Sequence, residues 1–302
     1  MSRFFVPKEF IKENSIHISQ KEAHHILDVM RLKVSDEVTV FDGTGKEYVG
    51  IIKRSGHRSL EVEIKEVRKS AVKEDYSVTL IQAIAKKDKM DYISQKATEL
   101  GVAYIVPVVT ERTIPDWNDE KKRGVVERWQ RISREAAKQC GRLDVPEISR
   151  IVSFKELIRH CEKPKAIASP VIARSDSDEA ILKTGSQQAA QSKKKIASSL
   201  TSFAPRNDEN ANRDTASLTV WDYDIKLIAA LSDKAIKIKD ALRSRGGVKI
   251  AVAIGPEGDF TPEEIEEAVR VGFKVVNLGP LTLKSDTAGL AVLSMINYEC
   301  RD

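Results

Sequence analysis

The pattern of apolar and polar positions changes its period near residue 75. Before that point, segments 38–52 and 59–67 alternate apolar with polar side chains, which is typical of half-buried strands in a small barrel. Asp42-Gly43 provides a hairpin turn within the first segment. Segment 21–32 has helical spacing at Ile26, Val29 and Met30, and it predicts a short helix that caps the barrel.

Beyond residue 75, continuous apolar runs alternate with helical patterns. Residues 78–85 predict a buried strand, 88–101 a helix that ends at Gly101, and 103–109 the next strand. The order of strand, helix and strand indicates an α/β domain with parallel pairing.

Residues 120–142 form the clearest amphipathic pattern in the chain. One side of the predicted helix collects Val125, Trp129, Ile132, Ala136 and Cys140, and the other collects Arg128, Arg131, Arg134, Lys138 and Arg142. We expect the first side to pack. The second fits either a solvated surface or a face that contacts nucleic-acid phosphates.

Residues from about 168 to 219 differ from the rest in composition. They are rich in Ser and Ala, and Phe203 is the only aromatic residue among them. Such a segment buries too little apolar surface to offset the entropy of ordering. We therefore expect an irregular or disordered insertion without chemistry, after which the α/β pattern resumes at 224–231.

Two loops follow predicted strands in the C-terminal part. In the first, Gly255-Pro256-Glu257-Gly258 ends a strand, and Thr261 with Glu264 predicts a capping box for the next helix. Glycines without Cβ atoms let backbone amides approach a ligand closely. In the second, Leu278-Gly279-Pro280 ends a strand, and residues 284–288 enter the last helix.

Such loops on neighbouring strand ends predict a site for one small molecule, with a sharp turn that binds nothing as the alternative. The Gly-x-Gly-x-x-Gly fingerprint is missing, which argues against NAD. Residues 43–46, Gly-Thr-Gly-Lys, do not lead from a strand into a helix, so we interpret them as a turn and not as a phosphate loop.

Bulk properties fit a soluble globular protein. The 302 residues are 41% hydrophobic and 31% charged, and Lys plus Arg exceed Asp plus Glu by 50 to 45. That surplus permits an anionic partner without requiring one. We expect a cytoplasmic protein with no membrane span. Three widely spaced cysteines predict neither a disulfide framework nor a metal site.

Several ordered motifs together resemble the RsmE-type family of 16S ribosomal RNA uridine-N3 methyltransferases, which belong to the SPOUT class. The motifs are RFFV at 3–6, QKATELGV at 95–102, Glu111-Arg112, EAAKQCGR at 135–142 with VPEI after it, IGPEGDFTPEEIEEA at 254–268 and LGPLTLKSDTA at 278–288. The resemblance covers both ends of the chain and fails across the predicted insertion.

The resemblance implies a PUA-like β-barrel that binds RNA at 1–72 and a trefoil-knotted α/β methyltransferase domain at 73–302, with S-adenosylmethionine as cofactor. It also implies a homodimer, for which Leu290, Leu293 and Ile296 offer an apolar stripe, although burial within one subunit is equally compatible. The implied cofactor residues are Leu231, Ile254, Gly255, Glu257, Gly258, Leu278, Gly279, Leu283, Ser285 and Ala288.

Methyl transfer to a uridine nitrogen requires alignment of that nitrogen with an activated methyl group and an acceptor for its proton. Glu257 and Asp286 are the nearby carboxylates, and either also suits a purely structural role. For RNA or an assembled small ribosomal subunit, the candidate contacts are Arg3, Arg31, Arg112, Arg131, Arg134, Lys138 and Arg142.

The sequence departs from the family pattern in the second loop. Leu281, Lys284, Ser285 and Asp286 stand where the family usually has Arg, Arg, Thr and Glu, and Asp259 stands where a third loop glycine is common. Loss of the first Arg removes a group that pairs with phosphate or orients a base. Two alternatives to an active uridine methyltransferase therefore remain: another SPOUT enzyme, such as a ribose 2′-O methyltransferase, and an RNA-binding assembly factor without activity.

Overall fold

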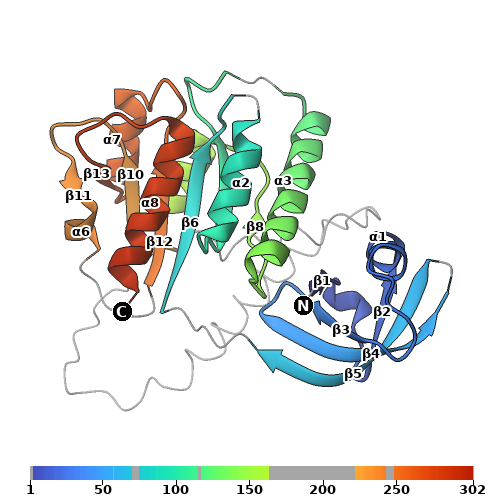
Figure 1. The fold of residues 1–302 in the computed structure, drawn as a ribbon. Coiled ribbons are helices and arrows are strands. Elements are labelled where there is room, and N and C mark those ends of the chain that lie inside the picture. Colours follow the sequence, from blue (N-terminus) through green and yellow to red (C-terminus); the bar gives the residue numbers. More distant parts are fainter. Residues whose placement is uncertain are drawn as a thin grey trace, which may run out of the picture. The chain divides into compact units, whose positions relative to one another are not determined.

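The structure is a computed structural model that describes residues 3–56, 58–69, 75–86, 88–114, 117–162, 222–242 and 248–301. The predicted insertion at about 168–219 and the expected domain boundary at 72/73 lie outside these residues. Two sheets organise the described part, one formed by strands before residue 70 and one by strands after residue 75 (Figure 1).

The N-terminal sheet has five strands in the order β1-β3-β4-β5-β2. The strands are β1 (Arg3–Phe5), β2 (Ser15–Ser19), β3 (Glu37–Phe41), β4 (Lys46–Ser55) and β5 (Ser59–Lys69). Edge strands β1 and β2 do not pair with each other in the described part, so the sheet is a curled half-barrel, which agrees with the small PUA-like barrel that was predicted. The short helix η1 (Lys8–Phe10) joins β1 to β2.

Local chemistry explains the turn and the helix of this sheet. At the β3–β4 turn, the Asp42 carboxylate accepts hydrogen bonds from the Thr44 amide and hydroxyl at 2.8 Å, and Gly43 has a φ of 77°. The predicted short helix is present as α1 (Gln20–His24), which continues into a π-helical turn, η2 (His25–Val29). Ile26 of this turn is fully buried in the core of the half-barrel.

The second sheet is parallel throughout, as the order of elements predicted. Its order is β11-β13-β10-β12-β6-β7-β8, with β9 paired to β7. The strands are β6 (Tyr76–Ala83), β7 (Tyr104–Val109), β8 (Glu147–Ile148), β9 (Val152–Ser153), β10 (Ile225–Ala229), β11 (Ile236–Lys237), β12 (Val248–Ile254) and β13 (Lys274–Asn277).

Helices cover both faces of this sheet, because successive strand residues point to opposite sides. Leu80 and Leu227 face one core with α2, α3, α6 and α8, whereas Ile81 and Ile228 face another with α4 and α7. The helices are α2 (Lys89–Glu99), α3 (Asp119–Cys140), α4 (Phe154–Cys161), α6 (Ile238–Ala241), α7 (Pro262–Arg270) and α8 (Ser285–Cys300). This α/β fold confirms the predicted class. That the chain forms a trefoil knot in this domain stays a prediction.

Helix α3 differs in two details from the predicted amphipathic pattern. Cys140, which we expected on the packed side, is exposed, because α3 ends there and Gly141 turns the chain with a φ of 83°. Arg142 therefore lies beyond the helix and not on its cationic side. The prediction is confirmed at the other packed positions of α3. Trp129 and Ala136 are buried, and Val125 and Ile132 are partly buried.

Helix α8 settles one alternative about the apolar stripe. Leu293 and Ile296 are fully buried against the sheet within one subunit. Leu290 is only partly buried, so the stripe belongs to the core at Leu293 and Ile296 and is partly accessible at Leu290. On its other side, α8 exposes Met295 and Tyr298, the latter with 83% of its surface accessible.

Candidate ligand-binding site

A cavity of about 470 Å³ lies at the carboxyl ends of β10, β12 and β13 and at the start of α8. Parallel α/β sheets bind ligands at this edge because several loops converge there. The cavity is lined by residues 229–231, 254–259, 276–279, 281–285 and Ala288. Every residue that the sequence assigned to the cofactor lines it, so the fold brings the whole set together.

The first loop has a well-defined helix start. The predicted capping box is present: the Thr261 hydroxyl accepts a hydrogen bond from the Glu264 amide at 3.2 Å, and the Glu264 carboxylate accepts one from the Thr261 amide at 3.0 Å. Pro262 occupies the first turn of α7. The Glu264 carboxylate also accepts a hydrogen bond from the Glu111 amide at 2.9 Å, which joins α7 to the loop after β7.

The two glycines of this loop are crowded by the protein itself. A Cβ atom on Gly255 would lie 3.0 Å from the Asp259 carboxylate and 3.2 Å from the Phe260 amide. One on Gly258 would lie 3.3 Å from Cδ of Arg112. Packing within the protein therefore favours a small residue at both positions, in addition to the expected approach of a ligand, which stays a prediction. In contrast, Gly279 has a φ of 120° and open space where its Cβ would stand.

A buried polar chain fixes the start of the same loop. Gln82, at the end of β6, is completely buried, and its Nε2 donates to the Ser285 hydroxyl at 3.0 Å. Ser285 in turn donates to the Gly255 carbonyl at 2.6 Å. Sequence reasoning placed Ser285 at the site but missed Gln82. The available signal was a glutamine within the otherwise apolar run 78–85, because a buried amide requires hydrogen-bond partners.

Three charged side chains meet beside the cavity, and one of them, Glu257, lines it. Lys89, at the start of α2, lies 2.9 Å from the Glu257 carboxylate and 3.8 Å from that of Asp286. Sequence reasoning named both acids but missed Lys89. One buried oxygen of Asp286 accepts no hydrogen bond from any described residue.

The Lys89–Glu257 ion pair shifts the pKa values of both groups. Partial burial of Glu257 favours its neutral form, but hydrogen bonds from Lys89, from its own amide and from the Lys86 amide together hold the pKa of Glu257 below its usual range. The hydrogen bond to Glu257 outweighs desolvation and raises the pKa of Lys89. Both groups are therefore charged at neutral pH.

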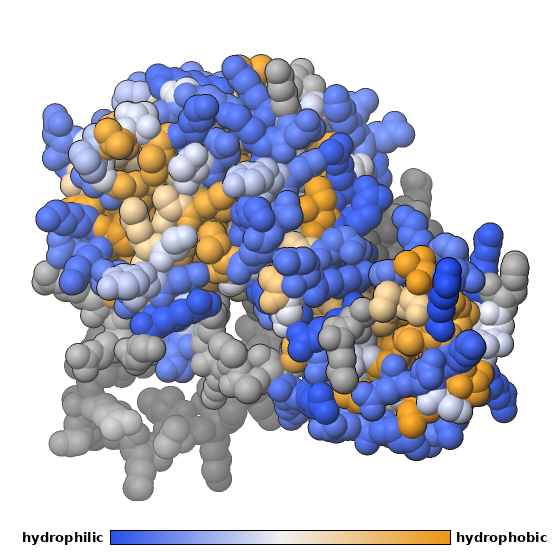
Figure 2. Space-filling model, in the orientation of Figure 1, coloured by the Kyte–Doolittle hydropathy of each residue, from blue (hydrophilic) through white to orange (hydrophobic). Residues whose placement is uncertain are grey.

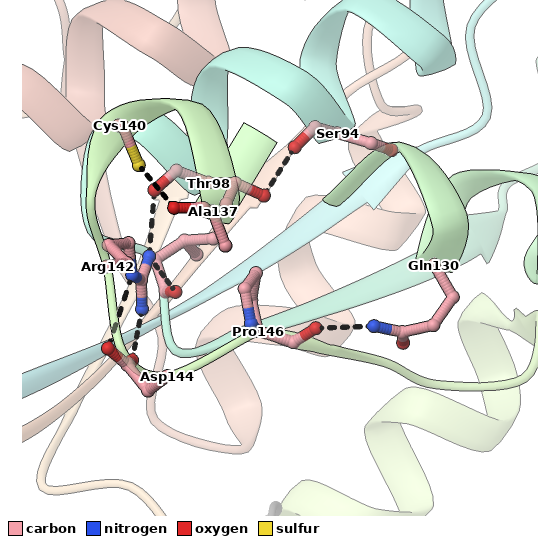
Figure 3. Close-up of polar contacts among 9 residues, drawn as sticks. Ser94, Thr98, Gln130, Ala137, Cys140, Arg142, Asp144 and Pro146 are labelled. Carbon is pink, nitrogen blue, oxygen red and sulfur yellow. Dashed lines mark hydrogen bonds and ion pairs between the residues drawn. The ribbon is translucent and has the colours of Figure 1, made fainter. Parts of the chain in front are cut away.

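The candidate RNA contacts are scattered, and many of them already have partners. Arg142 donates to the carbonyls of Thr98 at 2.8 Å and Val102 at 3.0 Å and forms an ion pair with Asp144 (Figure 3). Only 14% of its side chain is exposed. These contacts give Arg142 a structural role at the end of α2.

Three further candidates take part in contacts between residues 3–47 and the C-terminal part of α3 with the turn after it. Lys138 pairs with Glu22, and the Arg134 guanidinium lies 5.6 Å from the centre of the Phe5 ring. Arg3 donates to the Gly141 carbonyl at 2.7 Å and also pairs with Glu47.

Arg112 lies at the candidate cavity and not on the α3 surface. Its Nη1 donates to the Gly258 carbonyl at 2.7 Å. Within the described ranges, the side chains of Arg31 and Arg131 are exposed and make no hydrogen bond or ion pair, so of the seven candidate RNA contacts these two are the most available to a phosphate.

Among the described residues, no group of His, Cys, Asp and Glu side chains is arranged to hold a metal ion. The same part of the chain contains no helix that is long and apolar enough to cross a membrane.

The fold and the cavity define an α/β protein with a small-molecule site at the ends of parallel strands, preceded in the chain by a curled half-barrel sheet. Two family profiles give this class a name. The RNA methyltransferase domain family matches residues 72–197 and 172–297, and the RNA methyltransferase PUA domain matches residues 18–65. The chain belongs to this RNA methyltransferase family.

Curated relatives match nearly the whole chain. Ribosomal RNA small subunit methyltransferase E from Bacillus subtilis is 24% identical and covers 99% of this chain and 97% of its own length. The protein of the same name from Aquifex aeolicus is 26% identical, with 94% of each chain covered.

Solved structures also match nearly the whole chain. Ribosomal RNA small subunit methyltransferase E from Neisseria gonorrhoeae, bound to S-adenosylmethionine, has a TM-score of 0.69 and 26% identity and covers 99% of this chain and 97% of its own. A Legionella pneumophila structure with bound S-adenosylmethionine has a TM-score of 0.70 and 25% identity, with 98% and 96% covered.

Proposed function

We propose that this protein transfers a methyl group from S-adenosylmethionine to N3 of a uridine in 16S ribosomal RNA, as a two-domain enzyme divided near residue 72. The observation that carries the proposal is the cavity at the ends of β10, β12 and β13 in a chain that belongs to an RNA methyltransferase family. The names of the full-length relatives support the ribosomal substrate.

The residues around the cavity suit this cofactor. Leu278, Leu283 and Ala288 offer apolar contacts to an adenine ring, and the open side at Gly279 leaves room beside the backbone. The Glu257 carboxylate at the rim suits a cationic group such as the amino group of the methionine moiety. When bound, the cofactor supplies an activated methyl group.

Transfer to N3 also releases a proton from the uridine imide. We propose that a rim carboxylate, Glu257 or Asp286, accepts it directly or through water. Lys89 keeps Glu257 ionised, which maintains a proton acceptor at neutral pH but weakens its basicity. The Asp286 Oδ1 accepts no hydrogen bond from a described residue and has only the Lys89 ammonium 3.8 Å away.

The RNA is held by cations outside the cavity. We propose that Arg131 on α3 and Arg31 beside η2 contact phosphates, because both are exposed and have no partner among the described residues. Part of the Arg134 guanidinium is available to phosphate as well. Arg3, Lys138 and Arg142 already contact other residues, so RNA binding would require each of them either to keep these contacts or to exchange them for phosphate.

We also propose a homodimer that uses the surface beside the cofactor loops. Figure 2 shows apolar side chains gathered over α8, β10 and β13. Leu231, Leu281 and Met295 are among the exposed apolar residues of these elements and their loops, and 75% of the Leu281 surface is accessible. Burial of such side chains favours association. Sedimentation equilibrium of the full chain tests this part of the proposal.

The experiment that tests the function combines binding with product analysis. Calorimetry with S-adenosylmethionine separates a methyltransferase from an assembly factor that has lost the cofactor. Mass spectrometry of small-subunit RNA from cells with and without the gene identifies the modified base. A mark on ribose in place of uridine N3 would contradict the proposed substrate atom.

A further inference from the structure

The loop that bears Glu257 accepts hydrogen bonds from several neighbouring segments. Ser285 donates to the carbonyl of Gly255, and the Lys86 amide and Lys89 ammonium donate to the carboxylate of Glu257. The Leu231 amide makes a long contact of 3.4 Å with the Asp259 carboxylate. Residues 255–260 are thus held by segments that follow β6 and β10 and by α8.

A further attachment comes from the turn after β7. Nη1 of Arg112 donates to the Gly258 carbonyl at 2.7 Å and makes a weaker contact of 3.4 Å with the Phe260 carbonyl. The stem of the same side chain lies against Gly258, where a Cβ atom would stand 3.3 Å from Cδ and 3.4 Å from Cβ of Arg112. Gly258 does not have a positive φ, so its backbone conformation alone does not require glycine.

The turn that carries Arg112 is itself well fixed. The Thr110 amide donates to the Thr113 hydroxyl at 2.9 Å, and the Glu111 amide donates to Glu264 of the α7 capping box at 2.9 Å. Arg112 therefore extends from an anchored turn onto the backbone of the cavity loop. Gly258 lines the cavity, so a displacement of its carbonyl would change the cavity wall.

We propose that Arg112 is a positioning residue that holds the 255–260 loop in the shape that binds S-adenosylmethionine, and that it acts on methyl transfer through this loop and not through RNA phosphate. The inference rests on the proposed function. Its cause is the charged Nη1 of Arg112, which donates to the Gly258 carbonyl and lies near that of Phe260, together with the side-chain stem packed on Gly258. A lysine ammonium on a different stem reproduces this arrangement only in part.

The test measures S-adenosylmethionine affinity by calorimetry on the full chain. Arg112→Met should weaken binding about tenfold, the scale of one charge-assisted hydrogen bond that is partly exposed to water. Arg112→Lys should recover part of that loss. Arg159→Met, which changes an exposed arginine of α4, is the matched control and should leave the affinity unchanged.

A second variant separates loop positioning from a loss of folding. Gly258→Ala forces the Arg112 stem to move, so it should also weaken S-adenosylmethionine binding. Because both substitutions disturb one contact, the double variant should lose less affinity than the product of the two single losses. Independent, multiplicative losses would overturn the proposal. Thermal unfolding of each variant identifies any general loss of stability.

RNA affinity is the property that the Arg112 substitution should leave unchanged. Arg112→Met should retain the salt dependence of RNA affinity, whereas Arg131→Met should reduce its slope by up to about one unit if that residue contacts a phosphate. A reduced slope for Arg112→Met with unchanged S-adenosylmethionine affinity would overturn the inference. Failure of the parent protein itself to bind S-adenosylmethionine would instead overturn the proposed function.

Discussion

At the scale of single residues, Lys89 links the two acids at the rim of the cavity. It neutralises part of the charge of Glu257 and Asp286 and draws the first loop toward α2. Such half-exposed pairs contribute little to global stability. Their main effect here is on the geometry of the rim, where a small displacement alters ligand contacts.

Replacement of Lys89 by Met should therefore weaken S-adenosylmethionine binding by about three- to tenfold while the thermal unfolding midpoint changes little. The physical reason is repulsion between Glu257 and Asp286 once the ammonium is gone. Lys89→Arg retains the charge and serves as the control. Calorimetry measures both variants, and equal affinities for Lys89→Met and the parent would show that the ion pair does not shape the site.

The same pair predicts a flat pH profile. Because the pKa of Glu257 is lowered in the folded protein, its carboxylate stabilises the fold at pH values above the usual carboxyl range. This stabilisation is lost as the pH falls through the pKa of the folded state. Because the pKa of Lys89 is raised in the folded protein, the stabilisation from its ammonium is lost only as the pH rises through a pKa above the usual lysine range. The ion pair that shapes the site therefore persists between these two limits. Cofactor affinity should thus be nearly constant from about pH 6 to 9, and a titration midpoint within that window would contradict this.

Cysteine reactivity offers another test at this scale. Burial raises the pKa of the Cys161 thiol to about 11, and its side chain is almost completely covered. Cys140 is exposed. Because thiolate is the reactive form, a thiol reagent at pH 8 should label Cys140 rapidly and leave Cys161 unlabelled until the protein unfolds. Mass mapping of the labelled peptides measures the outcome.

At the scale of elements, α3 and the turn that ends it combine structural and surface cations. Arg142 satisfies carbonyls at the end of α2, whereas Arg131 faces outward without a partner among the described residues. Two arginines that look alike on a helical wheel therefore have different surroundings.

Arg142→Ala should reduce the free energy of unfolding by about 1–3 kcal/mol, because it removes the donor to the Val102 carbonyl and one of two donors to the Thr98 carbonyl. Arg131→Ala should leave stability within about 0.5 kcal/mol of the parent, as is usual for surface substitutions. Denaturant unfolding measures both. Equal stabilities would show that water replaces the Arg142 contacts, and the residue would again be a candidate for phosphate binding.

At the scale of the whole molecule, the described parts before and after the predicted insertion share one parallel sheet. Strands β6 to β9 precede it, and β10 to β13 follow it. The pairing of β12 with β6 joins these two parts in a continuous sheet (Figure 1).

Deletion of residues from Ser169 to Ala216 should therefore preserve cooperative unfolding and cofactor affinity. The change in loop-closure entropy with loop length is small, about 0.6 kcal/mol for each twofold change. Calorimetry on the deletion variant measures both properties. A broad, non-cooperative transition would show that the segment contributes to the fold.

Much of the architecture and the position of the site could be predicted from sequence because the relevant signals are local. The apolar periods of 78–85 and 88–101, the capping box at Thr261 and Glu264, and the two loops after strands each depend on residues close together in the chain. Parallel pairing then places those loops at one edge. The family resemblance added the identity of the cofactor set, which local patterns do not contain.

The sequence by itself determined the elements, the α/β class and the loops that line the cavity, since period, caps and turns act over a few residues. Only the tertiary structure decided that Gly258 makes room for Arg112, that Gln82 reaches Ser285, and that Arg142 is occupied by carbonyls of another helix end. Arg112 and Gly258 are 146 residues apart, and Gln82 and Ser285 are 203 apart. A helical pattern shows which side of a helix is charged, but the partner of each charge depends on which distant segment the fold brings beside it.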